Sequence, residues 1–256
     1  MIAFTIEGQV GKIILNRPEK FNSFNREMSL GLQEALDDCN KNVNVRAVYL
    51  SGSGKAFSAG QDLSEAMSPE GPGIEKIVNE HYNPIILGIR NLEKPVICAV
   101  NGVAAGAGAN IALACDIVVA GKSAAFIQAF SKIALVPDSG GTFFLPRLIG
   151  LQRATALMML GDKLSADDAM NMGMIYKVFE DADLESEAWK IAATLSEMPT
   201  RSLALTKKLL NKSFQNTLEE QLKEEGKLQT MAGSTEDFKE GVQAFMEKRK
   251  AVFKGI

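Results

Sequence analysis

The order of apolar segments along the chain is the feature that most constrains its fold. Short runs rich in β-branched residues alternate with helical patterns through the first two thirds, and from about Gly161 the strand-like runs nearly vanish. This alternation is typical of an α/β domain. We therefore expect a β/α core that continues, without a low-complexity linker, into a helical tail. The expected strands are 12–15, 45–50, 95–100 and 116–120.

Periodicity and capping patterns place the helices. Apolar residues at helical spacing follow the first strand and predict a helix that packs against a sheet: Met28, Leu32, Ala35, Leu36 and Cys39. Farther on, Pro84 interrupts a second apolar stripe, so we expect a kink or a restart there. Ser165–Asp168 and Ser234–Asp237 have the spacing of capping boxes, with which helices begin. The tail is expected to hold helices at 184–198, 200–214, 217–231 and 236–249.

Composition and charge argue against several classes of function. The 256 residues carry a formal net charge of −3 with acidic and basic side chains interleaved, so we expect neither nucleic acid nor a membrane as partner. The N-terminus does not resemble a signal peptide, no apolar run reaches membrane-spanning length, and the 3 cysteines form no paired motif. These features predict a cytoplasmic protein. Because His81 is the single histidine, we expect no metal site and no serine triad.

Two segments rich in small residues follow predicted strands, and each has a functional and a structural interpretation. In 57–63, the turn at Gly60 presents a bare N–H to a ligand or is an ordinary surface turn. In 101–110, a helix that begins among glycines and alanines exposes N–H donors to an anion or packs closely against a sheet. The glycine spacing there does not match a dinucleotide-binding fingerprint. Neither segment decides the function by itself.

A single acidic residue, Asp138, precedes the Ser-Gly-Gly run at 139–141. One interpretation is that it caps the helix that follows. Its neighbours are apolar, however, with Ile133 to Val136 before it and two phenylalanines after it. A carboxylate among apolar groups tends to have a raised pKa, which suits a general base.

Taken in order, several motifs resemble the enoyl-CoA hydratase/isomerase (crotonase) superfamily over essentially the whole chain. They are Leu15–Pro18 with Asn22–Asn25, Ala56–Asp62, and Lys94–Gly102 with the small-residue run that follows it. The resemblance implies an α/β fold with a spiral core of repeated strand–strand–helix turns over residues 1–195. It also implies a helical region, 196–256, that assembles homotrimers or hexamers.

The resemblance further implies a substrate and a site. The substrate would be an acyl-CoA thioester, so that coenzyme A is part of the substrate and no separate cofactor is expected. The backbone N–H groups of Ala59 and Ala107 would form an oxyanion hole around the thioester oxygen, and Phe130 and Tyr82 would line an aromatic acyl pocket. Other residues implied in substrate binding are Gly60, Gln61, Asp62, Gly106 and Gly108.

Two departures from the family pattern favour isomerisation. Hydratases of the family have glutamates where Asn110 and Phe130 stand, so we expect weak hydration. Asp138 falls where several isomerases keep their one acid, which would transfer the proton. The pattern resembles the members that isomerise a ring epoxide of phenylacetyl-CoA in phenylacetate degradation. Three alternatives stay open: a generic enoyl-CoA hydratase of fatty-acid β-oxidation, dehalogenase-type attack by Asp138, and a non-catalytic RNA-binding relative.

Overall fold

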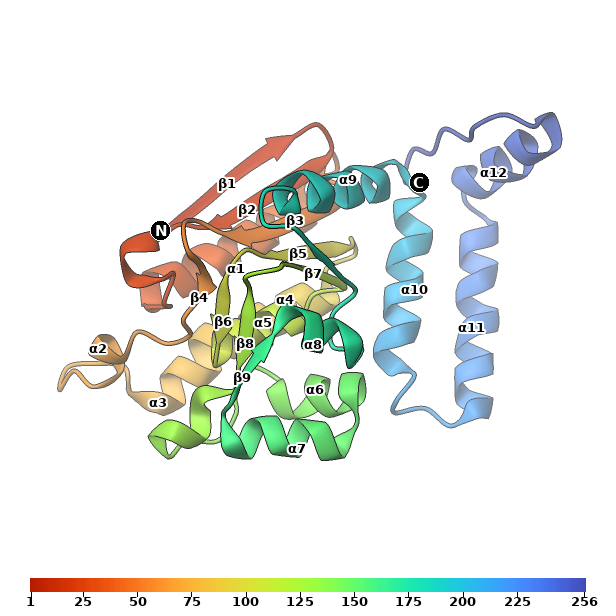
Figure 1. Ribbon diagram of the computed structural model, residues 1–256. Coiled ribbons are helices and arrows are strands. Elements are labelled where there is room, and N and C mark those ends of the chain that lie inside the picture. Colours follow the sequence, from red (N-terminus) through yellow and green to blue (C-terminus); the bar gives the residue numbers. More distant parts are fainter.

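Two sheets of mainly parallel strands form the core of the computed structural model, which describes residues 1–256 (Figure 1). In the larger sheet the order is β1-β2-β3-β5-β7-β10, and only β1 and β2 are antiparallel. Its strands are β1 (Ile2–Glu7), β2 (Val10–Leu15), β3 (Ala47–Gly52), β5 (Val96–Val100), β7 (Ile117–Gly121) and β10 (Lys177–Phe179). The smaller sheet has the order β4-β6-β8-β9, with β8 and β9 antiparallel. Its strands are β4 (Ala56–Ser58), β6 (Val103–Ala105), β8 (Ala125–Ile127) and β9 (Lys163–Ser165).

The chain winds through both sheets in a repeating turn. Strands β3 and β4, β5 and β6, and β7 and β8 are successive pairs, in which the first strand joins the larger sheet and the second joins the smaller one. Helices follow each pair, which confirms the predicted strand–strand–helix spiral. Because parallel sheets are covered on both faces, their strands are nearly continuous apolar runs, as in the fully buried Val96–Val100.

The predicted helices are present, with small shifts at their ends. The core helices are α1 (Arg26–Lys41), α2 (Leu63–Ala66), α3 (Gly73–Lys76), α4 (Asn83–Asn91), α5 (Ala107–Leu113), α6 (Gly141–Ile149), α7 (Leu151–Leu160), α8 (Ala166–Asn171) and α9 (Leu184–Glu197). The tail consists of α10 (Thr200–Lys212), α11 (Leu218–Gly233) and α12 (Glu236–Glu247). The apolar stripe predicted for α1 lies in the main hydrophobic core.

The structure adds four core strands that were not predicted, β1, β4, β6 and β8, and corrects two further details. After Gly161 two short strands remain, β9 and β10, and three residues each are too few to show a periodic apolar pattern. Helix α12 is capped by Thr235 rather than by Ser234, since the Thr235 hydroxyl accepts from the Phe238 N–H at 3.1 Å. Ser234 has helical backbone angles at the end of α11, so its side chain cannot take the extended cap position.

The segment around Pro84 changes its helical geometry rather than restarting. A π-helical turn, Ile77–Tyr82, links α3 to α4 without a break in the helical backbone, and Pro84 in the first turn of α4 has no N–H to donate to the preceding turn. Such turns are rare and are often found at functional sites. This one brings two successive side chains, His81 and Tyr82, into the interior.

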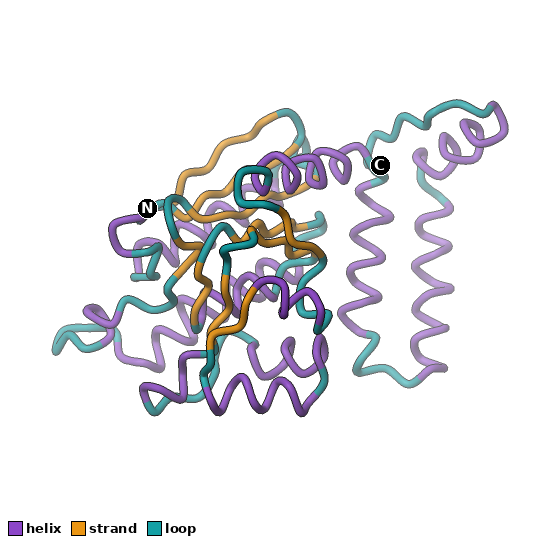
Figure 2. The backbone as a smooth tube through the Cα atoms, viewed as in Figure 1, coloured by secondary structure: helices purple, strands orange, loops and turns teal.

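The tail stands apart from the sheets, with α10 and α11 side by side (Figure 2), and buried cations attach it to the core. Lys207 on α10 forms an ion pair with Asp116 at 2.7 Å. Arg46, just before β3, donates to the carbonyls of Met198 and Phe253 at 2.7 and 2.9 Å. These bonds hold both the beginning of the tail and the end of the chain against the larger sheet.

The division of the chain into 1–195 and 196–256, and the assembly of the tail into trimers or hexamers, stay predictions. Helix α9 itself runs to Glu197, and the next helix begins at Thr200. None of the helices combines the length and the apolarity that crossing a bilayer requires.

Substitution of Lys207 by methionine tests how strongly the buried ion pair holds the tail. The Lys207 side chain is only 7% exposed, and its removal leaves the Asp116 carboxylate with Arg90 as its one charged partner. We expect Lys207→Met to lower the free energy of unfolding, measured in urea, by about 3 kcal/mol. Lys212→Met on the same helix, which removes an exposed pair with Glu224, should cost less than about 1 kcal/mol. Equal losses in the two variants would contradict this assignment.

Candidate active site

The two small-residue segments meet backbone to backbone at one edge of the smaller sheet. Strands β4 and β6 are parallel neighbours, so the segments that follow them leave the sheet side by side. A Cβ atom at Gly60 would lie 2.8 Å from the Ala105 carbonyl oxygen and 3.6 Å from the Ala107 nitrogen. One at Gly108 would lie 2.7 Å from the Ser58 carbonyl oxygen. Only glycine permits this approach, so the close-packing interpretation is correct for Gly108. Gly60 is buried in the same contact and is not part of an ordinary surface turn.

Two N–H groups at this contact have no hydrogen-bond acceptor, and one of them was not predicted. The Ala59 N–H donates to the Phe21 carbonyl at 2.9 Å, so it is not free for a thioester oxygen. Gln61, two residues on, pairs with Phe24 in a short parallel bridge. The two bonds of this bridge use the Gly60 carbonyl, which accepts from Phe24 N–H, and the Asp62 N–H, which donates to the Phe24 carbonyl. The Gln61 N–H itself therefore points away from Phe24 and, like the Ala107 N–H, donates to nothing in the chain. The second free N–H beside that of Ala107 thus belongs to Gln61 and not, as predicted, to Ala59.

Gly106 shapes the second of these donors. Its φ of +52° and ψ of −125° lie in a region that other residues rarely adopt, and α5 begins directly after it. The ring of Phe130 faces this glycine, 3.7 Å from the position that a Cβ atom would take. Phe130 is therefore close to the Ala107 donor, as expected of a residue that lines an acyl pocket, although it is itself buried.

Asp138 lies in the turn before α6, and its carboxylate does not cap that helix. The residue at the cap position is Gly140, and no side chain bonds to the first turn. Gly141 N–H donates to the backbone carbonyl of Asp138, and the carboxylate accepts only from the Ser139 hydroxyl, at 2.8 Å. Burial raises the pKa of Asp138 above its usual value, and the bond from Ser139 partly opposes this rise.

The apolar residues that precede Asp138 do not surround it closely. Leu135 and Val136 are 40% and 81% exposed, and Ile133 is exposed as well. Of the phenylalanines that follow, Phe144 lies close to Gly140 in the same turn. The direction of the predicted pKa shift was correct, and burial is its largest cause.

Asn110 holds the Asp138 turn in place. Its Nδ2 donates to the Asp138 carbonyl at 2.9 Å, and its Oδ1 accepts from Gln128 Nε2 at 2.8 Å. Asn110 is fully buried and lies against Gly141, whose missing side chain leaves the space. The sequence did not identify the Asp138 carbonyl as its partner, because the two residues are 28 positions apart.

Tyr82 does not line an open pocket. It is fully buried, and its hydroxyl donates to Gln61 Oε1 at 2.7 Å. Burial, with the negative charge of Asp138 as a second cause, raises the pKa of Tyr82 well above its usual value. Tyr82 is therefore bonded to the side chain of Gln61 and lies within reach of the charge of Asp138.

Asp62 has a structural role in place of the predicted substrate contact. It forms an ion pair with Arg17 at 2.7 Å, in which both side chains are almost buried, and it caps α2 by accepting from the Ser64 N–H. Burial alone would raise the pKa of Asp62, but the bonds from Arg17 and Ser64 hold it below its usual value. The sequence analysis missed Arg17 as the partner that fixes this loop.

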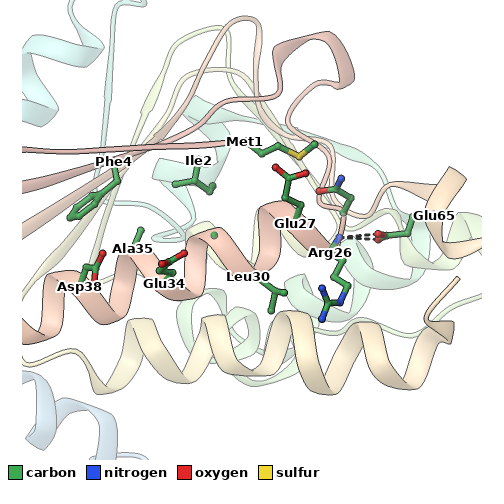
Figure 3. Close-up of a pocket in the computed structure, with 12 residues that line it drawn as sticks. Met1, Ile2, Phe4, Arg26, Glu27, Leu30, Glu34, Ala35, Asp38 and Glu65 are labelled. Carbon is green, nitrogen blue, oxygen red and sulfur yellow. Dashed lines mark hydrogen bonds between the residues drawn. The ribbon is translucent and has the colours of Figure 1, made fainter.

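A groove of about 690 Å³ lies elsewhere, between β1 and α1, and contains none of the predicted site residues (Figure 3). At its end the Glu65 carboxylate accepts from the Arg26 N–H at 3.0 and 3.1 Å and so closes the N-terminus of α1. Glu65 also accepts from Gln61 Nε2 at 3.3 Å, which connects the groove wall to the donor segment. No group of three or more His, Cys, Asp or Glu side chains is placed to hold a metal ion.

Asp138→Asn should stabilise the folded chain near neutral pH. The folded chain favours the protonated carboxyl group of Asp138, so ionisation of this group lowers the free energy of unfolding. This destabilisation is absent below the unfolded pKa of about 3.9 and develops as the pH rises through the raised pKa of the folded chain. By calorimetry, the variant should melt above the wild type at about pH 7 and together with it at about pH 3. A lower melting temperature of the variant at neutral pH would contradict the raised pKa.

Residues 5–256 match the model of the enoyl-CoA hydratase/isomerase family. The chain is 46% identical to the 1,2-epoxyphenylacetyl-CoA isomerase of Escherichia coli K12, over 98% of this chain and 97% of the relative. It is 42% identical to a probable enoyl-CoA hydratase of Rhodobacter capsulatus, over 99% and 98% of the two chains. The crystal structure of enoyl-CoA hydratase from Bacillus anthracis superposes with a TM-score of 0.93 at 35% identity, covering 100% of this chain and 99% of the other. The chain belongs to the enoyl-CoA hydratase/isomerase family and has its crotonase fold.

Proposed function

We propose that the protein is an acyl-CoA isomerase in which Asp138 carries the proton and the N–H groups of Gln61 and Ala107 hold the thioester oxygen. The observation that carries this proposal is that the chain combines a half-buried carboxylate of raised pKa with two N–H groups that have no acceptor. Asp138 is near enough to Tyr82, which bonds to the Gln61 side chain, for its charge to raise the pKa of Tyr82. A base of raised pKa is matched to proton transfer near neutral pH. Coenzyme A enters as part of the substrate, and the chemistry needs no other cofactor.

The reaction is a balanced proton shift. Asp138 removes a proton from C2 of the acyl chain, and the electron pair moves onto the thioester oxygen to give an enolate. Each preorganised N–H donor aimed at such a developing charge contributes about 3 kcal/mol in comparable oxyanion holes. Asp138 then returns the proton at another carbon as the electron pair moves back, so that the double bond is shifted. One carboxylate serves both steps.

An aromatic or ring-epoxide acyl group is the substrate class that we favour. The relative from Escherichia coli is named for isomerisation of 1,2-epoxyphenylacetyl-CoA. In this chain the edge of the Phe130 ring lies against Gly106, beside the Ala107 donor, so an aromatic side chain borders the place where the acyl group would bind. In such a substrate the equivalent electron flow opens the ring system towards an oxepin, again without loss of atoms. A role in phenylacetate degradation follows from this substrate.

Hydration is the second candidate, because the relative from Rhodobacter capsulatus is named as a hydratase. The contacts of Asn110 argue against it. Its carboxamide already donates to the Asp138 carbonyl and accepts from Gln128, so no group at that position is free to activate water. Phe130 supplies no acid or base at the other position. Dehalogenase-type attack by Asp138 and RNA binding have no supporting observation.

Deuterium exchange from solvent into C2 and C4 of a 3-enoyl-CoA tests the assignment of Asp138. We expect Asp138→Asn to slow both exchange and isomerisation by about 10²–10⁴-fold, because general acid–base catalysis supplies gains of this size. Asp167→Asn removes an exposed carboxylate on α8 and should leave both rates unchanged. A variant at 138 that keeps most of its exchange activity would overturn the proposed base.

The rate of water addition to crotonyl-CoA, monitored as the loss of its ultraviolet absorption, distinguishes the two candidate functions. With one carboxylate in place of two, hydration should run at least about 10²-fold more slowly than isomerisation of a 3-enoyl-CoA. Hydration at an equal or higher rate would favour the hydratase.

A further inference from the structure

We propose that Tyr82 is a positioning residue, whose hydroxyl fixes the Gln61 side chain and thereby the direction of the Gln61 N–H. This inference rests on the proposed function, in which that N–H holds the thioester oxygen. Tyr82 touches no substrate atom in this account. It acts through the residue to which it is bonded.

The peptide that carries the Gln61 N–H is restrained by the main chain at one end, because its Gly60 carbonyl accepts from the Phe24 N–H at 2.7 Å. Gly60 has a φ of +87° and no Cβ atom, so the local sequence itself does little to fix the plane of the peptide. The bonds to the Gln61 side chain add a second restraint. A donor that is to act on a developing charge must already point at it before the reaction begins.

The Gln61 carboxamide is held at both ends. Its Oε1 accepts from Tyr82 at 2.7 Å, and its Nε2 donates to the Glu65 carboxylate at 3.3 Å. Glu65 is fixed in turn on the Arg26 N–H. A carboxylate can only accept at this site, so the amide orientation is determined and the Tyr82 hydroxyl is the donor.

Tyr82 is itself held rigidly. The π-helical turn brings it into the interior, where its ring packs edge-on against Phe24, with centroids 6.0 Å apart. Phe24 also bridges Gln61 through the backbone. The same two aromatic residues therefore hold Gln61 by its main chain and by its side chain.

Tyr82→Phe removes the hydroxyl and keeps the packed ring. We expect kcat for isomerisation to fall about 10–100-fold with KM little changed, since misplacing a catalytic donor costs rates of this order. Tyr49→Phe is the matched control, because it deletes another buried hydroxyl in the separate core beside α9 and should leave kcat unchanged. In a Gln61→Met background, Tyr82→Phe should cause no further loss. Additive losses would show that Tyr82 does not act through Gln61.

The infrared carbonyl stretch of bound, carbonyl-labelled phenylacetyl-CoA reports on the donors without any turnover. Hydrogen bonds to the carbonyl lower its frequency, so this shift should be smaller in Tyr82→Phe than in the wild type and in Tyr49→Phe. An unchanged shift in Tyr82→Phe would overturn the inference. Asp138→Asn leaves both donors in place and should keep the full shift, so failure of the proposed base and failure of this inference are distinguishable.

Discussion

The contact between the ends of β4 and β6 is the constraint on which the candidate site depends. Two stretches of backbone can approach this closely only where side chains are missing, and Gly60 and Gly108 provide that space. The approach brings the Gln61 and Ala107 N–H groups, which come from different turns of the spiral, to one edge of the smaller sheet. The parallel pairing of the two strands makes this possible, because parallel strands end at the same edge.

Polar bonds place Asp138, the proposed base. Asn110 and Gln128, both buried, form a short chain of carboxamides that ends on the Asp138 carbonyl. This arrangement holds the backbone of the turn and leaves the carboxylate with a single bond, from Ser139. A carboxylate that accepts few hydrogen bonds and is partly shielded from water is poorly stabilised in its ionised form. Its pKa is therefore raised, which is the property that a proton-transferring base requires. The ionised form of Asp138, which a base needs, therefore lowers the stability of the fold.

The correction at Ala59 shows why a motif can identify a loop without identifying its working atom. The segment from Ala56 to Asp62 was recognised correctly, but its backbone turns at Gly60, where φ is +87°, so the N–H groups before and after this glycine point in different directions. One of them is used by Phe21 and another is left free at Gln61. Which of them is free depends on a loop that is far away in the sequence. A motif defined by residue types alone does not contain that information.

The sequence by itself determined four strands of the larger sheet, the main helices, the glycines at the strand ends and the single carboxylate of Asp138. These features depend on local periodicity, on the space that a side chain needs and on the presence of one acid, all of which can be read from neighbouring residues. The spiral repeat was expected from the family resemblance, and the strands of the smaller sheet were not predicted. Only the tertiary structure decided that Gln61 is the free donor, that Tyr82 is buried behind it, and that Asp62 is taken by Arg17. Hydrogen bonds and burial between residues far apart in the chain depend on which elements the fold brings together, and local pattern does not determine that.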